Sequence, residues 1–473
     1  MPKCGSLNWV IFVTFDDGIE WVFRSPMAGR NHFYSDETSS KIFLRSTHTG
    51  KYREFHPWTN RIENRLSGTS DNNIGVPYIL QSKAAGRSLG SYDWSQCPDR
   101  FTGSRHPQAL LPISDKGREI VMEQLGSIVA ELSNHRFDKI GSLFKDGNGG
   151  YVIGECLSPS LTWQERDSLD LNRGPFHQEH DYLSSLISAF TSHARELTIT
   201  PHIFYAPVPD NLHYNTIHSH SIATQRWNEF ASIGQKIDHS KNRLFYCIAG
   251  QFLFEMIPHL SSDVESSFPI SHPDLHVGNI YIDDDLNITC IIDWSSASTG
   301  PIAELLATPG LGGSARPPSD SLIVAFRSGF GRRVTKISPE LCNPKLWQTS
   351  DNMWYFSRLV RLLSRNDYEH FRRLFELVHE PSAEETGILY LFHERAKSDE
   401  NKKLLVELQE DDMTAEEVHE QERISISSTR RADSDAIAVA RKLTLMSEMN
   451  PGFLANHVLW RWVEEALRQD GLP

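Results

Sequence analysis

The sequence predicts an α+β protein of two lobes, a small β-rich N-terminal lobe and a large, mostly helical C-terminal lobe. Near the N-terminus, two runs of β-branched and aromatic residues flank a turn signal, which is typical of a strand hairpin. Beyond residue 114 apolar residues recur at helical spacing, and beyond 315 nearly the whole chain has this pattern. The length of 473 residues exceeds what one hydrophobic core usually serves. We therefore expect residues 1–82 to form the first lobe and residues 83–473 the second.

The first lobe is predicted to contain a small sheet. Residues 8–15 and 19–24 flank the sequence Asp-Asp-Gly at 16–18, which favours a tight turn between antiparallel strands. A third apolar run at 76–80 follows a turn-rich stretch, and we expect it to join the same sheet.

The second lobe is predicted to begin with an amphipathic helix over residues 114–134, because six apolar residues there recur at helical spacing. Ser114 is placed to cap its start. A second hairpin is expected over 141–154, followed by helical stretches at 180–198 and 220–256.

The composition is that of an ordinary globular protein, with 39% hydrophobic and 23% charged residues. The formal charge of -14, from 47 basic and 61 acidic residues, would repel nucleic acid, so we expect no nucleic-acid partner. The highly charged segment 399–431 is interpreted as a solvated helical face or a partly ordered connection.

The cysteines indicate a reducing compartment, because the six lie far apart and form no Cys-x-x-Cys pair. The most apolar early stretch, residues 9–15, is short and runs into Asp16 and Asp17. It fits neither a signal peptide nor a membrane span. We therefore expect a cytoplasmic protein that does not associate with membranes.

The segment 271–294 carries the candidate chemistry. Two apolar runs around a polar turn predict a tight antiparallel hairpin, which brings Asn279, entering the first strand, beside Asp293, leaving the second. Asp274 lies on the loop just before this hairpin. Such a set of oxygen donors suits Mg²⁺ bound jointly by protein and substrate phosphates, whereas zinc prefers more nitrogen or sulfur.

The motif His272-Pro-Asp274-Leu-His-Val-Gly-Asn279, followed by Ile-Ile-Asp293-Trp294, resembles the catalytic and metal-binding motifs of the aminoglycoside phosphotransferase and choline kinase family. The chain thus looks like a fungal-type phosphotransferase of that family. The resemblance implies a protein-kinase-like fold. It also implies ATP- and Mg²⁺-dependent transfer of the γ-phosphate to a hydroxyl of a small-molecule acceptor.

The same resemblance assigns roles within the motif. Asp274 matches the catalytic carboxylate, which accepts the proton of the acceptor hydroxyl or orients that hydroxyl. Asn279 and Asp293 match the two magnesium ligands. His272 matches a position that shapes the catalytic loop. For His276, a matching family histidine and a structural histidine remain two open readings.

The resemblance also implies binding residues in the first lobe. Gly5 and Ser6 would form the turn over the phosphates, where free backbone N–H groups favour glycine. Arg24 lies where the family usually has its phosphate-pairing lysine, and Glu37 is the candidate for its acidic partner. Residues 81–83, with Gln81 and Lys83, match the connection that holds the adenine edge. The acceptor site would include 177–180 and the region after residue 301.

Residues 38–67 depart from the family pattern, because they show no sustained apolar period where the family places a helix. We therefore expect an incomplete or anomalous first lobe, and a gene-model error across this segment is one hypothesis. Two alternatives to the kinase function stay open. One is a catalytically impaired pseudokinase that binds nucleotide or a partner. The other is a metal-dependent hydrolase with His272, Asp274 and His276 as ligands.

Overall fold

The predicted α+β class is confirmed, with a small β-rich N-terminal region and a large, mostly helical C-terminal region. The computed structural model describes residues 3–4, 8–26, 64–67, 72–94, 110–145, 150–199, 202–262, 267–312, 316–334, 339–379, 385–428 and 434–469. The chain divides into two compact units, the first formed by 1–96, 108–189 and 257–357, the second by 97–107, 190–256 and 358–473. The predicted boundary after residue 82 falls inside the first unit and stays a prediction.

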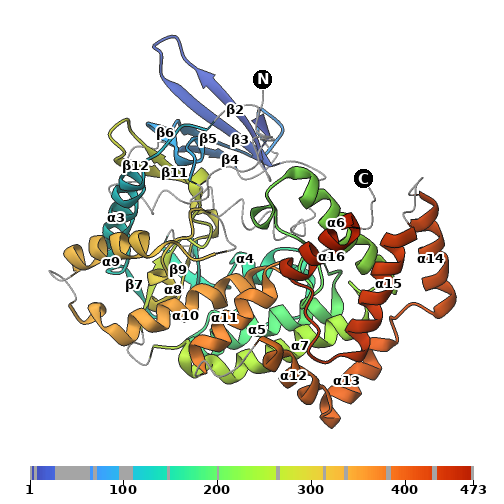
Figure 1. The fold of residues 1–473 in the computed structure, drawn as a ribbon. Coiled ribbons are helices and arrows are strands. Elements are labelled where there is room, and N and C mark those ends of the chain that lie inside the picture. The colour runs from blue at the N-terminus through green and yellow to red at the C-terminus, as the bar shows by residue number, and fades with distance from the viewer. Residues whose placement is uncertain are drawn as a thin grey trace. The chain divides into compact units, whose positions relative to one another are not determined.

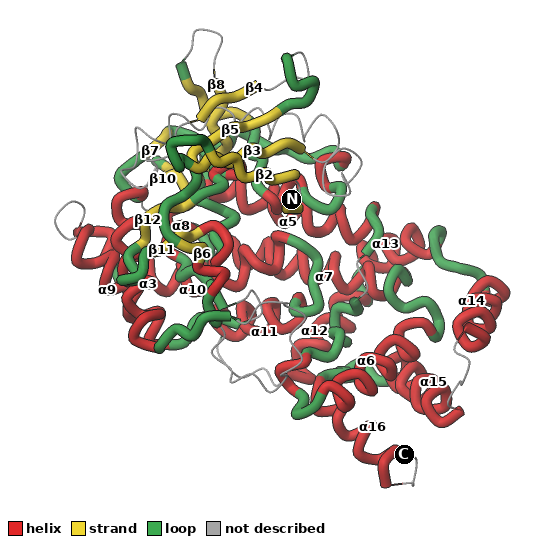
Figure 2. Tube along the Cα trace, turned by 90° about the horizontal axis from the view of Figure 1, so that it is seen from above, coloured by secondary structure: helices red, strands yellow, loops and turns green. Residues whose placement is uncertain are grey.

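The N-terminal sheet is antiparallel. Its strands, in order across the sheet, are β1 (Lys3–Cys4), β2 (Asn8–Thr14), β3 (Glu20–Pro26), β5 (Tyr78–Ser82) and β4 (Asn64–Ser67). The blue hairpin of β2 and β3 in Figure 1 is the predicted one, closed by a hydrogen bond from Phe15 N to Ile19 O at 2.9 Å. Gly18 makes the turn with a φ of 80°. The third predicted strand is β5, which pairs with β3 and runs beside it in Figure 2.

The first unit continues with a capped helix and a second sheet. Its further elements are α3 (Asp115–Leu132), β7 (Arg136–Phe137), β8 (Gly141–Lys145), β9 (Tyr151–Gly154), α4 (Pro159–Thr162), β10 (Phe268–Ser271), β13 (Ser298–Thr299), α8 (Ile302–Leu306) and α9 (Asp320–Val334). The second sheet has the strand order β7-β10-β13-β8-β9. The helix predicted from residue 114 is α3, and the Ser114 side chain accepts a hydrogen bond from Gly117 N at 3.0 Å, as expected of a cap. The hairpin predicted over 141–154 is β8–β9.

Helices α3 and α9 pack backbone to backbone (Figure 1). A Cβ added at Gly126 would overlap the carbonyl oxygen of Phe326, and one added at Gly329 would overlap that of Glu123. Ser127 Oγ donates a hydrogen bond to Gly329 O at 3.1 Å. The two glycines therefore permit a close approach that no larger residue allows.

The second unit is helical in its described part. Its helices, two of which (α5 and α10) begin in the first unit, are α5 (Glu179–Glu196), α6 (Ile217–Ser232), α7 (Ser240–Met256), α10 (Pro344–Arg361), α11 (Asp367–Val378), α12 (Glu385–Ala396), α13 (Asp399–Gln409), α14 (Ala415–Ser428), α15 (Ser434–Met449) and α16 (His457–Gln469). The helices predicted at 180–198 and beyond 315 are confirmed. The stretch 220–256 is two helices rather than one, because Gly234 and Gln235 take φ values of 77° and 51° between them. The charged segment 399–431 contains α13, which is largely exposed but buries Asn401 and Leu408, and the exposed helix α14.

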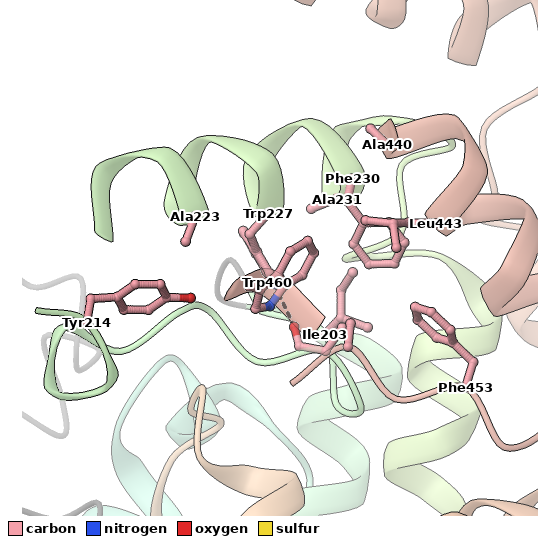
Figure 3. Packing of buried hydrophobic residues seen from close by; sticks show 12 residues of the cluster. Ile203, Tyr214, Ala223, Trp227, Phe230, Ala231, Ala440, Leu443, Phe453 and Trp460 are labelled. Carbon is pink, nitrogen blue, oxygen red and sulfur yellow. Dashed lines mark hydrogen bonds between the residues drawn. The ribbon is translucent and has the colours of Figure 1, made fainter. Parts of the chain in front are cut away.

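An aromatic core joins α6, α15 and α16 within the second unit (Figure 3). Trp227 and Trp460 are 2% and 1% exposed, and Phe230 and Phe453 pack with them. The indole N–H of Trp227 donates to Ala206 O at 2.6 Å, drawn as the dashed line in Figure 3. Burial of such large rings stabilises the position of the C-terminal helices.

We expect the stability of the second unit to depend on pH, because His202 is buried within it. It is 4% exposed, and burial lowers its pKa from 6.5 to about 4, although Asp367 Oδ2 lies 3.7 Å from its Nε2. The folded state therefore binds the proton less readily than the unfolded state, so stability is full above about pH 6.5 and declines as the pH falls towards 4. We expect a loss of about 3 kcal/mol over this range.

The measurement is urea unfolding of the wild type and His202→Gln at pH 7 and pH 4.5. Because glutamine does not titrate, the variant should lose less stability between the two pH values. Equal losses in the two proteins would contradict the assignment to His202.

In the described part of the chain, Cys156, Cys247, Cys290 and Cys342 are reduced and form no disulfide, which agrees with the prediction for these four. Among the described helices, none combines the length and the apolar character needed to cross a membrane.

Candidate active site

The predicted catalytic hairpin is formed by β11 (Ile280–Ile282) and β12 (Ile288–Ile291). The strands are antiparallel with Ile280 opposite Ile291, and β6 (Arg87–Ser88) pairs with the other edge of β11. Beyond the last strand pair, Ile292 N donates to Asn279 O at 2.9 Å. The hairpin base therefore brings the start of β11 next to Asp293, as the sequence predicted.

The far end of the hairpin is held by its own turn and by α3. The carboxylate of Asp283 accepts hydrogen bonds from Asp285 N and Asn287 N, and these bonds lower its pKa. Gln124 of α3 donates to Leu286 O and accepts from Ile288 N, both at 2.9 Å. Asp283 is thus a turn residue, and a single side chain ties the turn to the helix.

Asn279 shapes the loop that carries Asp274. Its side-chain Nδ2 donates to the backbone carbonyl of Asp274 at 3.0 Å, and its backbone N donates to His276 O at 2.9 Å. Asn279 is only 6% exposed. Because the amide nitrogen is committed to the loop, the amide oxygen is the atom available to a cation.

His272 ties the loop to the second strand of the hairpin. Its Nε2 lies 2.9 Å from Ile292 O, so this nitrogen carries the proton, and its ring packs edge-on against Trp294 at 4.8 Å between ring centroids. Burial lowers the pKa of His272, against the opposing effect of the Ile292 carbonyl and of Asp274 and Asp293. A neutral, buried imidazole fits the predicted role of shaping the loop.

Asp293 contacts Arg24 across the first unit. Arg24 Nη2 lies 3.2 Å from Asp293 Oδ2, with the side chains 17% and 30% exposed. Asp293 has a left-handed backbone with φ 64° and ψ 53°, where aspartate is tolerated better than most residues. The next residue, Trp294, donates its indole N–H to Ile291 O at 2.9 Å. Hydrogen bonds of the residues before and after Asp293 therefore fix its backbone.

His276 caps the short turn before β11. Its Nδ1 accepts from Gly278 N at 3.0 Å, and its Nε2 lies 3.9 Å from Asp274 Oδ2. The ring is 54% exposed, against 25% for Asp274. His276 thus makes a structural contact and also lies beside the carboxylate of Asp274. Both interpretations of His276, a family histidine and a structural histidine, therefore stay open.

Of the other predicted nucleotide-binding residues, Gln81 and Lys83 lie at the N-terminal sheet, and the rest lie outside the described residues. Gln81 pairs with Val22 of β3 and Asn64 of β4. Lys83 Nζ forms an ion pair with Glu20 Oε2 at 2.5 Å. The remaining predicted residues, Gly5, Ser6 and Glu37, lie outside the described residues.

The sequence did not single out a buried acid, Glu304 on α8. Tyr182 Oη donates to Glu304 Oε2 at 3.1 Å. Burial raises the pKa of Glu304 to about 7, the Tyr182 hydrogen bond lowers it, and Glu179 raises it. The bond joins a residue just beyond the predicted acceptor segment 177–180 to the predicted region after residue 301. Proximity to residue 301 was the only signal for Glu304 in the sequence.

The donor set fits a hard divalent cation. One amide oxygen and one carboxylate at the hairpin base are the type of ligands that Mg²⁺ accepts while it keeps water and phosphate oxygens. Among the described residues, no group of three or more His, Cys, Asp and Glu side chains is arranged to hold a metal ion by itself. Two protein ligands would therefore leave most of the coordination sphere to phosphate and water.

No protein-family model matches the chain. It is 25% identical over 320 residues to a subtelomeric hrmA-associated cluster protein in each of two strains of Aspergillus fumigatus. The match covers 63% of this chain and 57% of these relatives, so it spans little more than half of their length.

Two solved structures that resemble the chain are phosphotransferases. One is a thermostable mutant of aminoglycoside phosphotransferase APH(4)-Ia in its apo form, with 13% identity, a TM-score of 0.38, and coverage of 81% of this chain and 95% of that chain. The other is macrolide 2'-phosphotransferase MphH from Brachybacterium faecium, with 13% identity, a TM-score of 0.35, and coverage of 81% and 93%.

Proposed function

We propose that this chain is a phosphotransferase of protein-kinase-like fold that transfers the γ-phosphate of ATP to a hydroxyl of a small-molecule acceptor. The observation that supports this most is the hairpin base. There Asn279 is bonded to the loop of Asp274, and Asp293 meets the arginine of the N-terminal sheet. A catalytic carboxylate, two oxygen ligands and one cation are what phosphoryl transfer requires of a protein.

Asp274 is the residue that acts on the acceptor. Its backbone carbonyl is fixed by Asn279, and its side chain is 25% exposed, so the carboxylate is positioned and accessible. It orients the acceptor hydroxyl and takes its proton as the new O–P bond forms and the bond from the γ-phosphorus to the β–γ bridging oxygen breaks, which releases ADP. His272 keeps the loop in place from the side of β12.

Asn279 and Asp293 would hold Mg²⁺ through their side-chain oxygens, and the bound ion would supply positive charge to offset the negative charge of the phosphates. Arg24 pairs with a phosphate, and its planar fork suits an anion with several oxygens. On the resemblance, Gly5, Ser6 and Glu37 stay proposed nucleotide-binding residues. Residues 81–83, with Gln81 and Lys83, are proposed to lie along the adenine edge, although Lys83 N already donates to Glu20 O at 3.0 Å.

The first test is nucleotide binding with and without Mg²⁺, because it does not require a known acceptor. We expect ATP to bind at least tenfold more tightly with Mg²⁺ present, and Asp293→Asn to lose most of this gain, since a neutral amide is a weaker ligand. Isothermal titration calorimetry measures both effects. The matched control is Asp284→Asn, which removes the same charge from the exposed turn of the same hairpin.

The outcomes separate the candidate functions. Mg²⁺-dependent binding together with ADP release in the presence of pooled small alcohols and amino-sugars supports the kinase. Binding without ADP release supports the pseudokinase alternative. Absence of nucleotide binding, with zinc at unit stoichiometry, would contradict the proposal and favour the hydrolase alternative.

A further inference from the structure

The ion pair between Arg24 and Asp293 joins two rigid elements of the first unit. Arg24 lies on β3, where it is opposite Val10 of β2 and Ile79 of β5, so its backbone is held on both sides. Asp293 is fixed by the hairpin base that Asn279 closes. At 3.2 Å the guanidinium contacts the carboxylate that is proposed to bind the metal.

We propose that Arg24 is a counter-ion that keeps a divalent cation off Asp293 until a nucleotide is present, so that metal and nucleotide bind together. This inference rests on the proposed function and adds an order of binding at the same site. A carboxylate in contact with a guanidinium is already neutralised, and a divalent cation placed there would be repelled by the nearby positive charge. A phosphate group releases the carboxylate, because it gives Arg24 another partner of equal or greater charge.

The charges around the pair support this assignment to Arg24. The ammonium of Lys83 pairs with Glu20. Within the part of the chain that the structure describes, Arg24 is a cation in direct contact with Asp293.

The test measures metal binding without nucleotide, with Mn²⁺ as the probe and electron paramagnetic resonance as the readout. Arg24→Met should bind Mn²⁺ about fivefold more tightly than the wild type, because the competing charge is gone. Arg24→Lys keeps the charge and should bind Mn²⁺ like the wild type. The matched control is Arg87→Met, which removes an exposed arginine from β6. With ATP present the order reverses, and Arg24→Met should bind the Mn²⁺–ATP complex more weakly than the wild type.

The results separate this inference from the proposed function. If the wild type binds Mn²⁺–ATP but Arg24→Met binds Mn²⁺ alone no better than the wild type, the counter-ion inference is wrong. The ion pair would then only stabilise the fold, and the sole effect of Arg24→Met would be a lower unfolding temperature. If the wild type binds neither Mn²⁺ nor Mn²⁺–ATP, both the proposed function and the inference are overturned.

Discussion

Replacing Asp274 by Asn is expected to lower kcat for phosphoryl transfer about a thousandfold, since a positioned general base contributes roughly this much. The amide keeps the shape of the side chain but cannot accept a proton from the acceptor hydroxyl. Its backbone contact with Asn279 is unaffected, because Asn279 bonds to the carbonyl of residue 274 and not to its side chain. Nucleotide affinity should therefore stay within about twofold of the wild type.

ADP release with an acceptor found in the screen measures kcat, and calorimetry measures nucleotide affinity. Asp284→Asn is again the control, because it changes the same charge on the exposed turn and should leave kcat unchanged. If Asp274→Asn retains more than a tenth of the wild-type kcat, Asp274 is not the catalytic base, and the mechanism proposed here is wrong.

Replacing Gly329 by Ala is expected to cost about 3 kcal/mol and to lower Tm by about 5 °C. The new Cβ would overlap the carbonyl oxygen of Glu123, which is backbone of the facing helix and cannot rotate away. Helix α9 would have to move away from α3, and the hydrogen bond from Ser127 to the carbonyl of residue 329 would lengthen. Circular dichroism during heating measures the shift.

The control for this substitution is Gly387→Ala on α12. A Cβ at Gly387 would meet nothing within 4 Å, so the change should be neutral or stabilising by up to about 1 kcal/mol, the helix propensity of alanine over glycine. A similar Tm for Gly329→Ala and the wild type would show that the α3–α9 contact relaxes without cost.

The sequence predicted the local elements well, because their signals lie within a few residues. The hairpin of 280–292 is an example, since two apolar runs and a polar turn define it without help from the rest of the chain. The closeness of Asn279 and Asp293 followed from strand pairing alone. The break of the predicted 220–256 stretch at Gly234 could also have been anticipated from that glycine.

Contacts between distant segments could not be predicted in the same way. Arg24 and Asp293 are 269 positions apart, and Tyr182 and Glu304 are 122 apart. No periodicity or spacing rule relates residues at such distances, since their meeting depends on the tertiary arrangement. For the same reason the raised pKa of Glu304 was not foreseen, because it results mainly from burial.

The side-chain amide of Gln124 makes both hydrogen bonds that link helix α3 to the turn of the β11–β12 hairpin, one as a donor and one as an acceptor. A glutamate there would be nearly identical in size, but it would lose the donor to Leu286 O while keeping the acceptor for Ile288 N. The turn would then keep one of its two hydrogen bonds to Gln124, while β6 still pairs with the other edge of β11. A change at this helix position therefore alters how the turn is held without replacing Asn279 or Asp293.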